Sequence, residues 1–185
     1  MKKIIFWYGS LLWAEWWNKT LNRKIYSNDL KYIEVKWFKR VWNYTNPIIF
    51  LDEPKKIYWW VFLDIIEDSK SILNWYGLEV SDYEFELIKQ REKWYKMLNI
   101  TKNIINPLKW YEYFTSYLIN KNNNNWLNNI IARKYVDFVE AIVNNYSKDF
   151  ILKYRKSTSV IKFHIKDWDY KFVDNNINKA TWRIC

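Results

Sequence analysis

The sequence predicts an α+β fold: a small mixed, mainly antiparallel and barrel-like β-sheet with a few flanking helices. Short apolar or alternating segments of strand length recur along the chain, whereas only a few stretches repeat apolar residues at helical spacing. So few intervening helices favour antiparallel pairing, because parallel strands need a long crossover between them. With 185 residues, 50% of them hydrophobic, the chain is long enough to bury the core of one domain.

The expected strands lie mostly in the first two thirds of the chain. The first is a short apolar run that ends at the turn signal Gly9-Ser10. A second turn is expected at residues 43–47, between two strands, and a short helix or loop at 18–30. The expected strands are 2–8, 31–44, 48–52, 56–66, 95–101 and 109–119.

The clearest helix start is at Ser81, which has Glu84 three residues later and so forms a capping-box pattern. Phe85 and Ile88 would then face the core. Residues 128–146 read as an amphipathic helix and 147–157 as a second helix, with residues 160–175 as a peripheral hairpin. The apolar side of the 128–146 helix would carry Ile131, Tyr135, Phe138, Val139 and Ile142.

The formal net charge of +10 raises the possibility of nucleic-acid binding. The basic residues are scattered, however, and Asn and Lys are abundant throughout, so a solvated basic surface is favoured and no nucleic-acid partner is expected. Such a surface could still attract an anionic small substrate. No apolar run is long enough to span a bilayer, so no membrane partner is expected either.

The cysteine content and the N-terminus both favour a cytoplasmic protein. A single cysteine, Cys185, excludes an internal disulfide framework. The N-terminus imitates a signal peptide, but the turn at Gly9-Ser10 interrupts its apolar run and no small-x-small cleavage site follows before Glu15.

Elimination leaves carboxylates and backbone amides as the chemistry of the chain. One histidine, His164, lies in an alternating segment where a half-buried strand residue is favoured over a catalytic role, and the sequence contains no His/Cys cluster for a metal. The turn from Tyr8 to Leu11 could direct its amides at an anion, or be an ordinary turn that ends a strand. Glu92, at the end of the expected helix, could be a general acid or base with a raised pKa, or a solvated surface residue.

Five segments occur in the order in which the gamma-glutamylcyclotransferase-like superfamily carries its motifs, and the chain resembles the bacterial type of that family. "FWYGSLL" is similar to the family's first strand and turn, "KWFKRVWN" to its second strand, and "YWWVFLDI" to a third. "REKWYKMLNIT" is similar to the end of its helix, and "RKYVDFVEAIVNNYSKDFILKYRKST" to its later helical part. The resemblance covers about residues 3–160, so we expect a domain at 1–160 and a C-terminal extension at 161–185 packed on it.

The resemblance implies an enzyme that cyclises a gamma-glutamyl group to 5-oxoproline and releases the amine or peptide behind it. By family analogy Glu92 moves the proton, and the backbone of Tyr8, Gly9, Ser10 and Leu11 holds the glutamyl part. Arg40 and Tyr95 match recurrent family positions and are candidate ligand contacts, with an ion pair and a core aromatic as the alternatives. No metal or organic cofactor is implied. A non-catalytic binding module on the same fold and a single-stranded RNA-binding protein remain as other hypotheses.

The family's glycine positions carry tryptophan in this chain, at Trp7, Trp37, Trp60 and Trp94. The whole sequence contains 2 glycines and 14 tryptophans, and glycine and tryptophan together are about as frequent as glycine usually is. One hypothesis is that many of these residues are encoded by UGA and are glycine in the native protein. The rival is a divergent protein that is rich in tryptophan, whose indoles at residues 7 and 94 would crowd the cleft.

Overall fold

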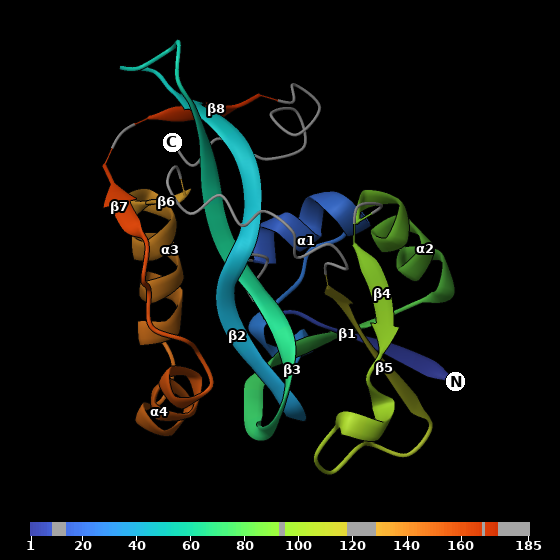
Figure 1. Cartoon of the computed structure of the whole chain (residues 1–185). Coiled ribbons are helices and arrows are strands. Elements are labelled where there is room, and N and C mark those ends of the chain that lie inside the picture. The colour runs from blue at the N-terminus through green and yellow to red at the C-terminus, as the bar shows by residue number, and fades with distance from the viewer. Residues whose placement is uncertain (9–13, 93–94, 118–128, 168, 174–185) are drawn as a thin grey trace.

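The computed structural model describes residues 1–8, 14–92, 95–117, 129–167 and 169–173 (Figure 1). Four helices, two short 3-10 turns and eight strands follow one another within these ranges. The elements are β1 (Lys2–Phe6), α1 (Ala14–Leu21), η2 (Ser27–Asp29), β2 (Leu30–Phe50), β3 (Ile57–Val80), α2 (Asp82–Arg91), β4 (Lys96–Asn99), η3 (Thr101–Asn103), β5 (Tyr111–Tyr117), β6 (Asn129–Ala132), α3 (Arg133–Asn144), α4 (Lys148–Lys156), β7 (His164–Lys166) and β8 (Tyr170–Phe172).

All eight strands belong to one mixed sheet, which confirms the expected α+β class. The main path is β4-β5-β1-β3-β2-β8, in which β1 runs parallel to β5 and the other neighbours are antiparallel. Strand β6 adds to β3, and β7 to β6, both in parallel. Among the described residues, the edge strands β4 and β8 do not pair with each other, so this curved sheet is open rather than a closed barrel.

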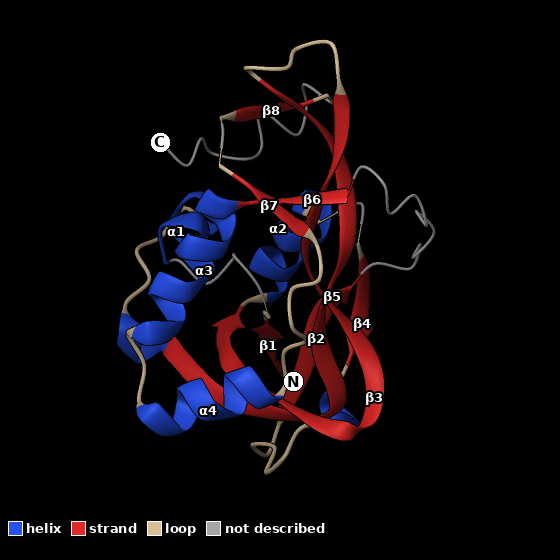
Figure 2. Ribbon diagram, turned by 60° about the vertical axis from the view of Figure 1, so that its left-hand side comes forward, coloured by secondary structure: helices blue, strands red, loops and turns tan. Residues whose placement is uncertain are grey.

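The long β2–β3 ribbon divides the molecule into two sides. In the view of Figure 1, helices α3 and α4 lie on one side of the ribbon, and α1 and α2 lie on the other together with β1, β4 and β5. Figure 2 shows the same elements coloured as helices and strands. Two apolar clusters fill the interior, and strand β1 contributes to both. The larger one includes Phe6, Tyr8 and Tyr154, and the smaller one, under α1 and α2, includes Trp7 and Ile88. None of the described helices could span a bilayer, since the longest, α3, has 12 residues and about 20 are needed.

The turn expected at residues 43–47 is wrong, because β2 runs through it from Leu30 to Phe50. A register shift between Trp42 and Tyr44 absorbs the local irregularity, and Pro47 stays paired opposite Trp59. Strand β3 likewise continues to Val80, beyond the expected end at residue 66. Pairing along the whole ribbon thus outweighs the local turn and charge signals.

Two expectations for the C-terminal third also need correction. The helix expected to begin at residue 128 begins at Arg133, because residues 129–132 pair with β3 and β7 as a strand. The described residues of the range 160–175 do not form the expected hairpin: β7 pairs with β6, and β8 pairs with β2. His164 begins β7 and is exposed rather than half-buried. Both segments pair with strands that are distant in sequence. The local alternation of apolar residues cannot indicate which strand will be the partner.

Two tryptophans have a backbone conformation that suits glycine. Trp37 has φ 72° and Trp110 has φ 71°, in the left-handed region where a bulky side chain is disfavoured. The other described non-glycine residues with positive φ are Asn22 and Asn106, a residue type that tolerates this region. Trp37 also lies at a register shift between Lys36 and Phe38, where bulges commonly carry a glycine. Trp37, at one of the positions where the resemblance leads us to expect glycine, thus has a backbone conformation that favours glycine.

Candidate active site

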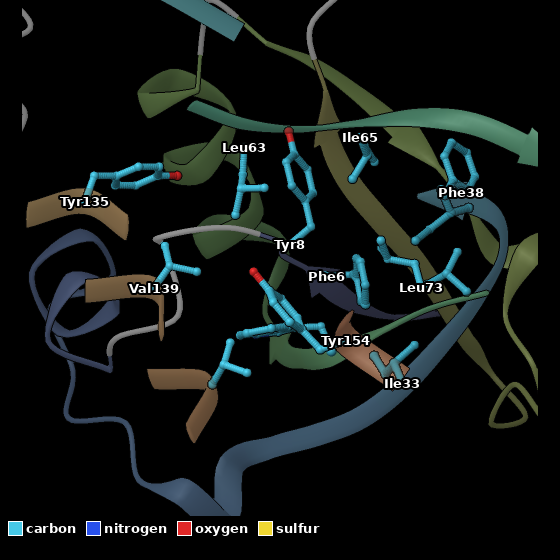
Figure 3. Packing of buried hydrophobic residues seen from close by; sticks show 14 of the residues in the cluster. Phe6, Tyr8, Ile33, Phe38, Leu63, Ile65, Leu73, Tyr135, Val139 and Tyr154 are labelled. Carbon is cyan, nitrogen blue, oxygen red and sulfur yellow. The ribbon is translucent and has the colours of Figure 1, made fainter. Parts of the chain in front are cut away.

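Tyr8 lies two residues beyond the end of β1 and points into the larger cluster. Its ring lies between Leu63 and Ile65, with the hydroxyl directed at β3 (Figure 3). The hydroxyl donates a hydrogen bond to Oδ1 of Asp64 at 3.2 Å. Burial, followed by the charge of Asp64, raises the pKa of Tyr8 well above its ordinary value, so the phenol stays protonated as a donor.

Arg40, in the middle of β2, holds the main chain of Tyr8. Its Nε donates to the Tyr8 carbonyl at 2.9 Å, its Nη1 to Oγ of Ser157 at 3.0 Å, and its Nη2 to the Asn74 carbonyl. The guanidinium carbon lies 4.4 Å from the ring centre of Tyr154. Burial lowers the pKa of Arg40 to about 10, so the side chain remains a cation at neutral pH.

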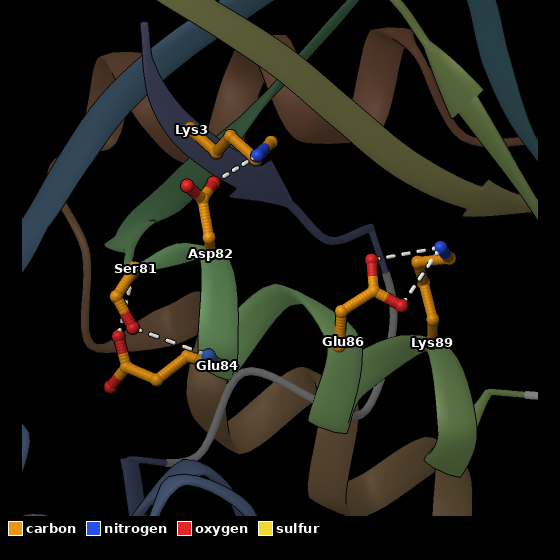
Figure 4. Close-up of polar contacts among 6 residues, drawn as sticks. All are labelled: Lys3, Ser81, Asp82, Glu84, Glu86 and Lys89. Carbon is orange, nitrogen blue, oxygen red and sulfur yellow. Dashed lines mark hydrogen bonds and ion pairs between the residues drawn. The ribbon is translucent and has the colours of Figure 1, made fainter.

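Helix α2 carries the candidate acid–base residue at its C-terminal end. It begins as expected: the Ser81 hydroxyl accepts from the Glu84 amide at 3.2 Å, and the Glu84 carboxylate accepts from the Ser81 amide at 2.8 Å (Figure 4). Phe85 and Ile88 are buried in the smaller cluster, against β1. Capping and this apolar face together fix where the helix ends.

Glu92 is the residue at which α2 ends. Its amide donates to the Ile88 carbonyl at 2.8 Å, and its carbonyl accepts from the Tyr95 amide at 2.7 Å. The residue is only 9% exposed, which decides against a solvated surface glutamate. Burial raises the pKa of the Glu92 carboxyl, and Arg91 opposes this from 3.5 Å. A buried carboxyl whose pKa is raised can serve as a general acid or base.

The fold brings three of the candidate residues together. Burial raises the pKa of the Tyr8 hydroxyl, and the charges of Asp64, Tyr95 and Glu92 raise it further, so all three groups act on Tyr8. Arg40 is linked to this group because its side chain donates a hydrogen bond to the Tyr8 carbonyl. That Arg40 contacts a ligand stays a prediction. Gly9, Ser10 and Leu11, which complete the predicted turn, lie outside the described residues.

Asp64 is the site residue that sequence reasoning missed. It is 1% exposed, within a strand whose neighbours are apolar. A carboxylate in the middle of "YWWVFLDII" was the available signal, because a buried charge must be hydrogen-bonded or paired to be tolerated.

The tryptophans at two of the family's glycine positions are tightly crowded. The ring centres of Trp7 and Trp17 are 3.4 Å apart at an interplanar angle of 52°, whereas tilted aromatic rings usually pack about 4.5–7 Å apart. Trp60 lies 4.0 Å from Phe62 and 4.2 Å from Tyr170. Within the described ranges the buried indole nitrogens of Trp7 and Trp60 have no hydrogen-bond partner, which is costly. Trp94 lies outside the described residues.

No cluster of three or more His, Cys, Asp or Glu side chains suited to a metal ion occurs in the described part of the chain. The site as described therefore consists of two carboxyls, two phenols and the cations of Arg40 and Arg91. Such a set can accept and return a proton and can hold a polar substrate.

No family model matches the sequence, and a search of curated proteins also gives no match. Solved structures do match. A gamma-glutamyl cyclotransferase superposes with a TM-score of 0.55 at 8% identity, over 97% of this chain and 98% of the other. An uncharacterised human protein superposes with a TM-score of 0.54 at 10% identity, over the same shares of the two chains. The chain therefore has the gamma-glutamylcyclotransferase-like fold over nearly its whole length.

Proposed function

We propose that the protein cyclises a gamma-glutamyl group to 5-oxoproline and releases the attached amine or peptide. The observation that carries this proposal is the buried carboxyl of Glu92, whose pKa is raised and whose charge acts on the Tyr8 hydroxyl, in a chain of this fold. Both residues occupy positions that match the motifs quoted from the sequence. The substrate would be an anionic small molecule, and the net charge of +10 favours its approach.

The reaction needs no covalent intermediate with the protein, because the nucleophile belongs to the substrate. Glu92 takes a proton from the α-ammonium group, and the freed amine attacks the γ-carbonyl carbon of the same molecule. The new C–N bond closes the five-membered ring, and the old C–N bond breaks as Glu92 returns the proton to the leaving nitrogen. The second proton of the ring nitrogen passes to the released amine, which leaves as an ammonium ion, so that Glu92 ends as the carboxylate. The protein contributes by folding the substrate into a near-attack geometry and by moving this proton.

The Glu92→Gln variant provides the direct test, with 5-oxoproline release from several gamma-glutamyl compounds as the measurement. We expect a loss of about 100-fold or more, because a positioned acid–base group typically contributes that much. Glu86→Gln is the matched control: Glu86 lies on the same helix, is exposed and pairs with Lys89, so its turnover should equal that of the wild type. Full turnover in Glu92→Gln would remove this residue from the mechanism.

A non-catalytic binding module is the second candidate, and the crowding at Trp7 favours it. The indole packs tightly against Trp17 in the smaller cluster, one residue before Tyr8. Such crowding would disturb the near-attack geometry that turnover requires more than it would disturb simple binding. If this candidate is correct, 5-oxoproline raises the melting temperature while no gamma-glutamyl compound is turned over. Turnover by the chain with tryptophan at residue 7 would exclude it.

A further inference from the structure

Helix α2 packs against α1 and against the turn that follows α1 (Figure 1). Leu21, at the end of α1, and Ile25, in the turn, are buried in the same apolar cluster as Phe85 and Ile88 of α2. Apolar burial holds the two elements together, but it is not directional and does not by itself fix how one helix slides or tilts on the other. Polar contacts at the two ends of α2 add that direction.

Arg23 holds the N-terminal end of α2. Its Nε donates to Oε1 of Glu84 at 2.5 Å, and its Nη2 donates to the Glu79 carbonyl at 3.1 Å. The other carboxylate oxygen of Glu84 accepts from the Ser81 amide at 2.8 Å, so one carboxylate serves both the helix cap and Arg23. The Glu84 side chain is only 14% exposed. A planar guanidinium that binds two groups in this way fixes their relative orientation.

The turn that carries Arg23 is itself fastened to α1. Asn22 follows the last residue of α1 with φ 49°, the left-handed conformation that often ends a helix and that asparagine tolerates. Two residues after Arg23, the Ile25 amide donates to Oδ1 of Asn18 on α1 at 2.7 Å. Arg23 therefore reaches α2 from a main chain that is held to α1 on both sides.

Thr20 holds the opposite end of α2. Its hydroxyl accepts from Nη1 of Arg91, the last residue of the helix, while Nε of the same guanidinium lies 3.5 Å from Oε1 of Glu92. The ten residues of α2 make it about 15 Å long, so the contacts of Arg23 and Thr20 lie far apart along one helix. Two such contacts resist both sliding and tilting, which a single contact does not.

We propose that residues 17–25 form a clamp that holds α2 at both ends, in which Thr20 and Arg23 are positioning residues for the Glu92 carboxyl. The catalytic effect of the clamp rests on the proposed function, whereas the clamping of α2 does not. Neither residue needs to touch the substrate. A proton-transferring group works only within hydrogen-bond reach of its proton, about 2.6–3.2 Å, so a small shift of the helix end lowers the rate.

Amide hydrogen exchange at residues 85–92 tests the clamp without any substrate. Arg23→Gln and Thr20→Val should each speed exchange there about tenfold, because each removes a hydrogen bond to a charged group that holds the helix. Glu86→Gln is the matched control: it removes the ion pair with Lys89 on the exposed face of the same helix (Figure 4) and should leave this exchange nearly unchanged. Equal exchange in the clamp variants and in the control would overturn the clamp.

Steady-state kinetics test the positioning of Glu92. Thr20→Val should lower kcat about tenfold with little change in KM, and Thr20→Ser, which keeps the hydroxyl, should restore most of the rate. The acid limb of the pH profile should stay in place in Thr20→Val, because the charge of Arg91 remains. A wild-type kcat in Thr20→Val, or an equal loss in Thr20→Ser, would overturn the positioning role. If the wild type releases no 5-oxoproline, the proposed function fails, while hydrogen exchange still decides the clamp.

Discussion

Nε of Arg91 lies 3.5 Å from Oε1 of Glu92, so the last residue of α2 places a cation beside the buried carboxyl that follows it. The two influences oppose one another: burial raises the pKa of Glu92, and Arg91 lowers it. Burial is the larger. Arg91 also donates through Nη1 to the Thr20 hydroxyl on α1, which ties the pair to the neighbouring helix.

Replacement of Arg91 by glutamine should move the acid limb of the pH profile of kcat/KM to higher pH. Without the cation the pKa of Glu92 rises further, and a higher pH is needed to form the carboxylate that accepts the proton. Thr20→Val is the control, because it removes the Thr20 contact of Arg91 and leaves the charge in place. An acid limb that stays unmoved in Arg91→Gln would contradict the assignment of Glu92 as the base.

The variant Glu92→Gln should be more stable than the wild type at neutral pH. Because the folded-state pKa of Glu92 is raised above 4.5, the folded protein binds a proton more tightly than the unfolded chain. The stability of the wild type therefore falls as the pH rises from about 4.5 through the folded-state pKa, and this loss persists above it. Glutamine does not titrate and causes no such loss. The free energies of unfolding of the two proteins, measured with urea, should therefore converge below pH 4.5. A difference that does not depend on pH would contradict this origin.

Glycine in place of Trp37 or Trp110 should stabilise the fold. Both residues have positive φ, which costs an L-residue about 1–2 kcal/mol, and glycine would remove this cost. Glycine also increases the conformational entropy of the unfolded chain, which offsets part of the stabilisation. We expect a net gain of about 1 kcal/mol in chemical denaturation. Trp59→Gly is the control: Trp59 lies within β3 without positive φ, so glycine there should destabilise the protein. Destabilisation by all three variants would contradict the backbone argument.

The native protein's mass decides between glycine and tryptophan at the family's glycine positions. If UGA codons at residues 7, 37, 60 and 94 are read as glycine, the intact mass is lower by the difference between the two side chains at each such codon. Peptide mapping would assign the exchange at Trp7 and Trp60, the two crowded positions. UGG codons at these positions, with the full tryptophan mass, would refute reassignment.

Local patterns predicted those elements whose signals lie within a few residues. The capping box at Ser81 and the apolar spacing of Phe85 and Ile88 gave the correct helix, because a helix satisfies its hydrogen bonds locally. The strands around β1, β4 and β5 were also expected. The turn at residues 43–47 and the hairpin at 160–175 failed, since pairing with β3, β2 and β6 decides those segments.

The amino-acid sequence alone predicted the fold class and the helix that ends at Glu92. It also contains the motifs that single out Tyr8 and Glu92. Only the tertiary structure determined the features that depend on residues far apart in sequence. These are the burial of Glu92, the Tyr8–Asp64 hydrogen bond across 56 positions, and the hydrogen bond from Arg40 to the Tyr8 carbonyl. The reason is physical, because a pKa shift and a buried hydrogen bond depend on the exclusion of water by packed neighbours, and no local sequence pattern encodes which neighbours those are.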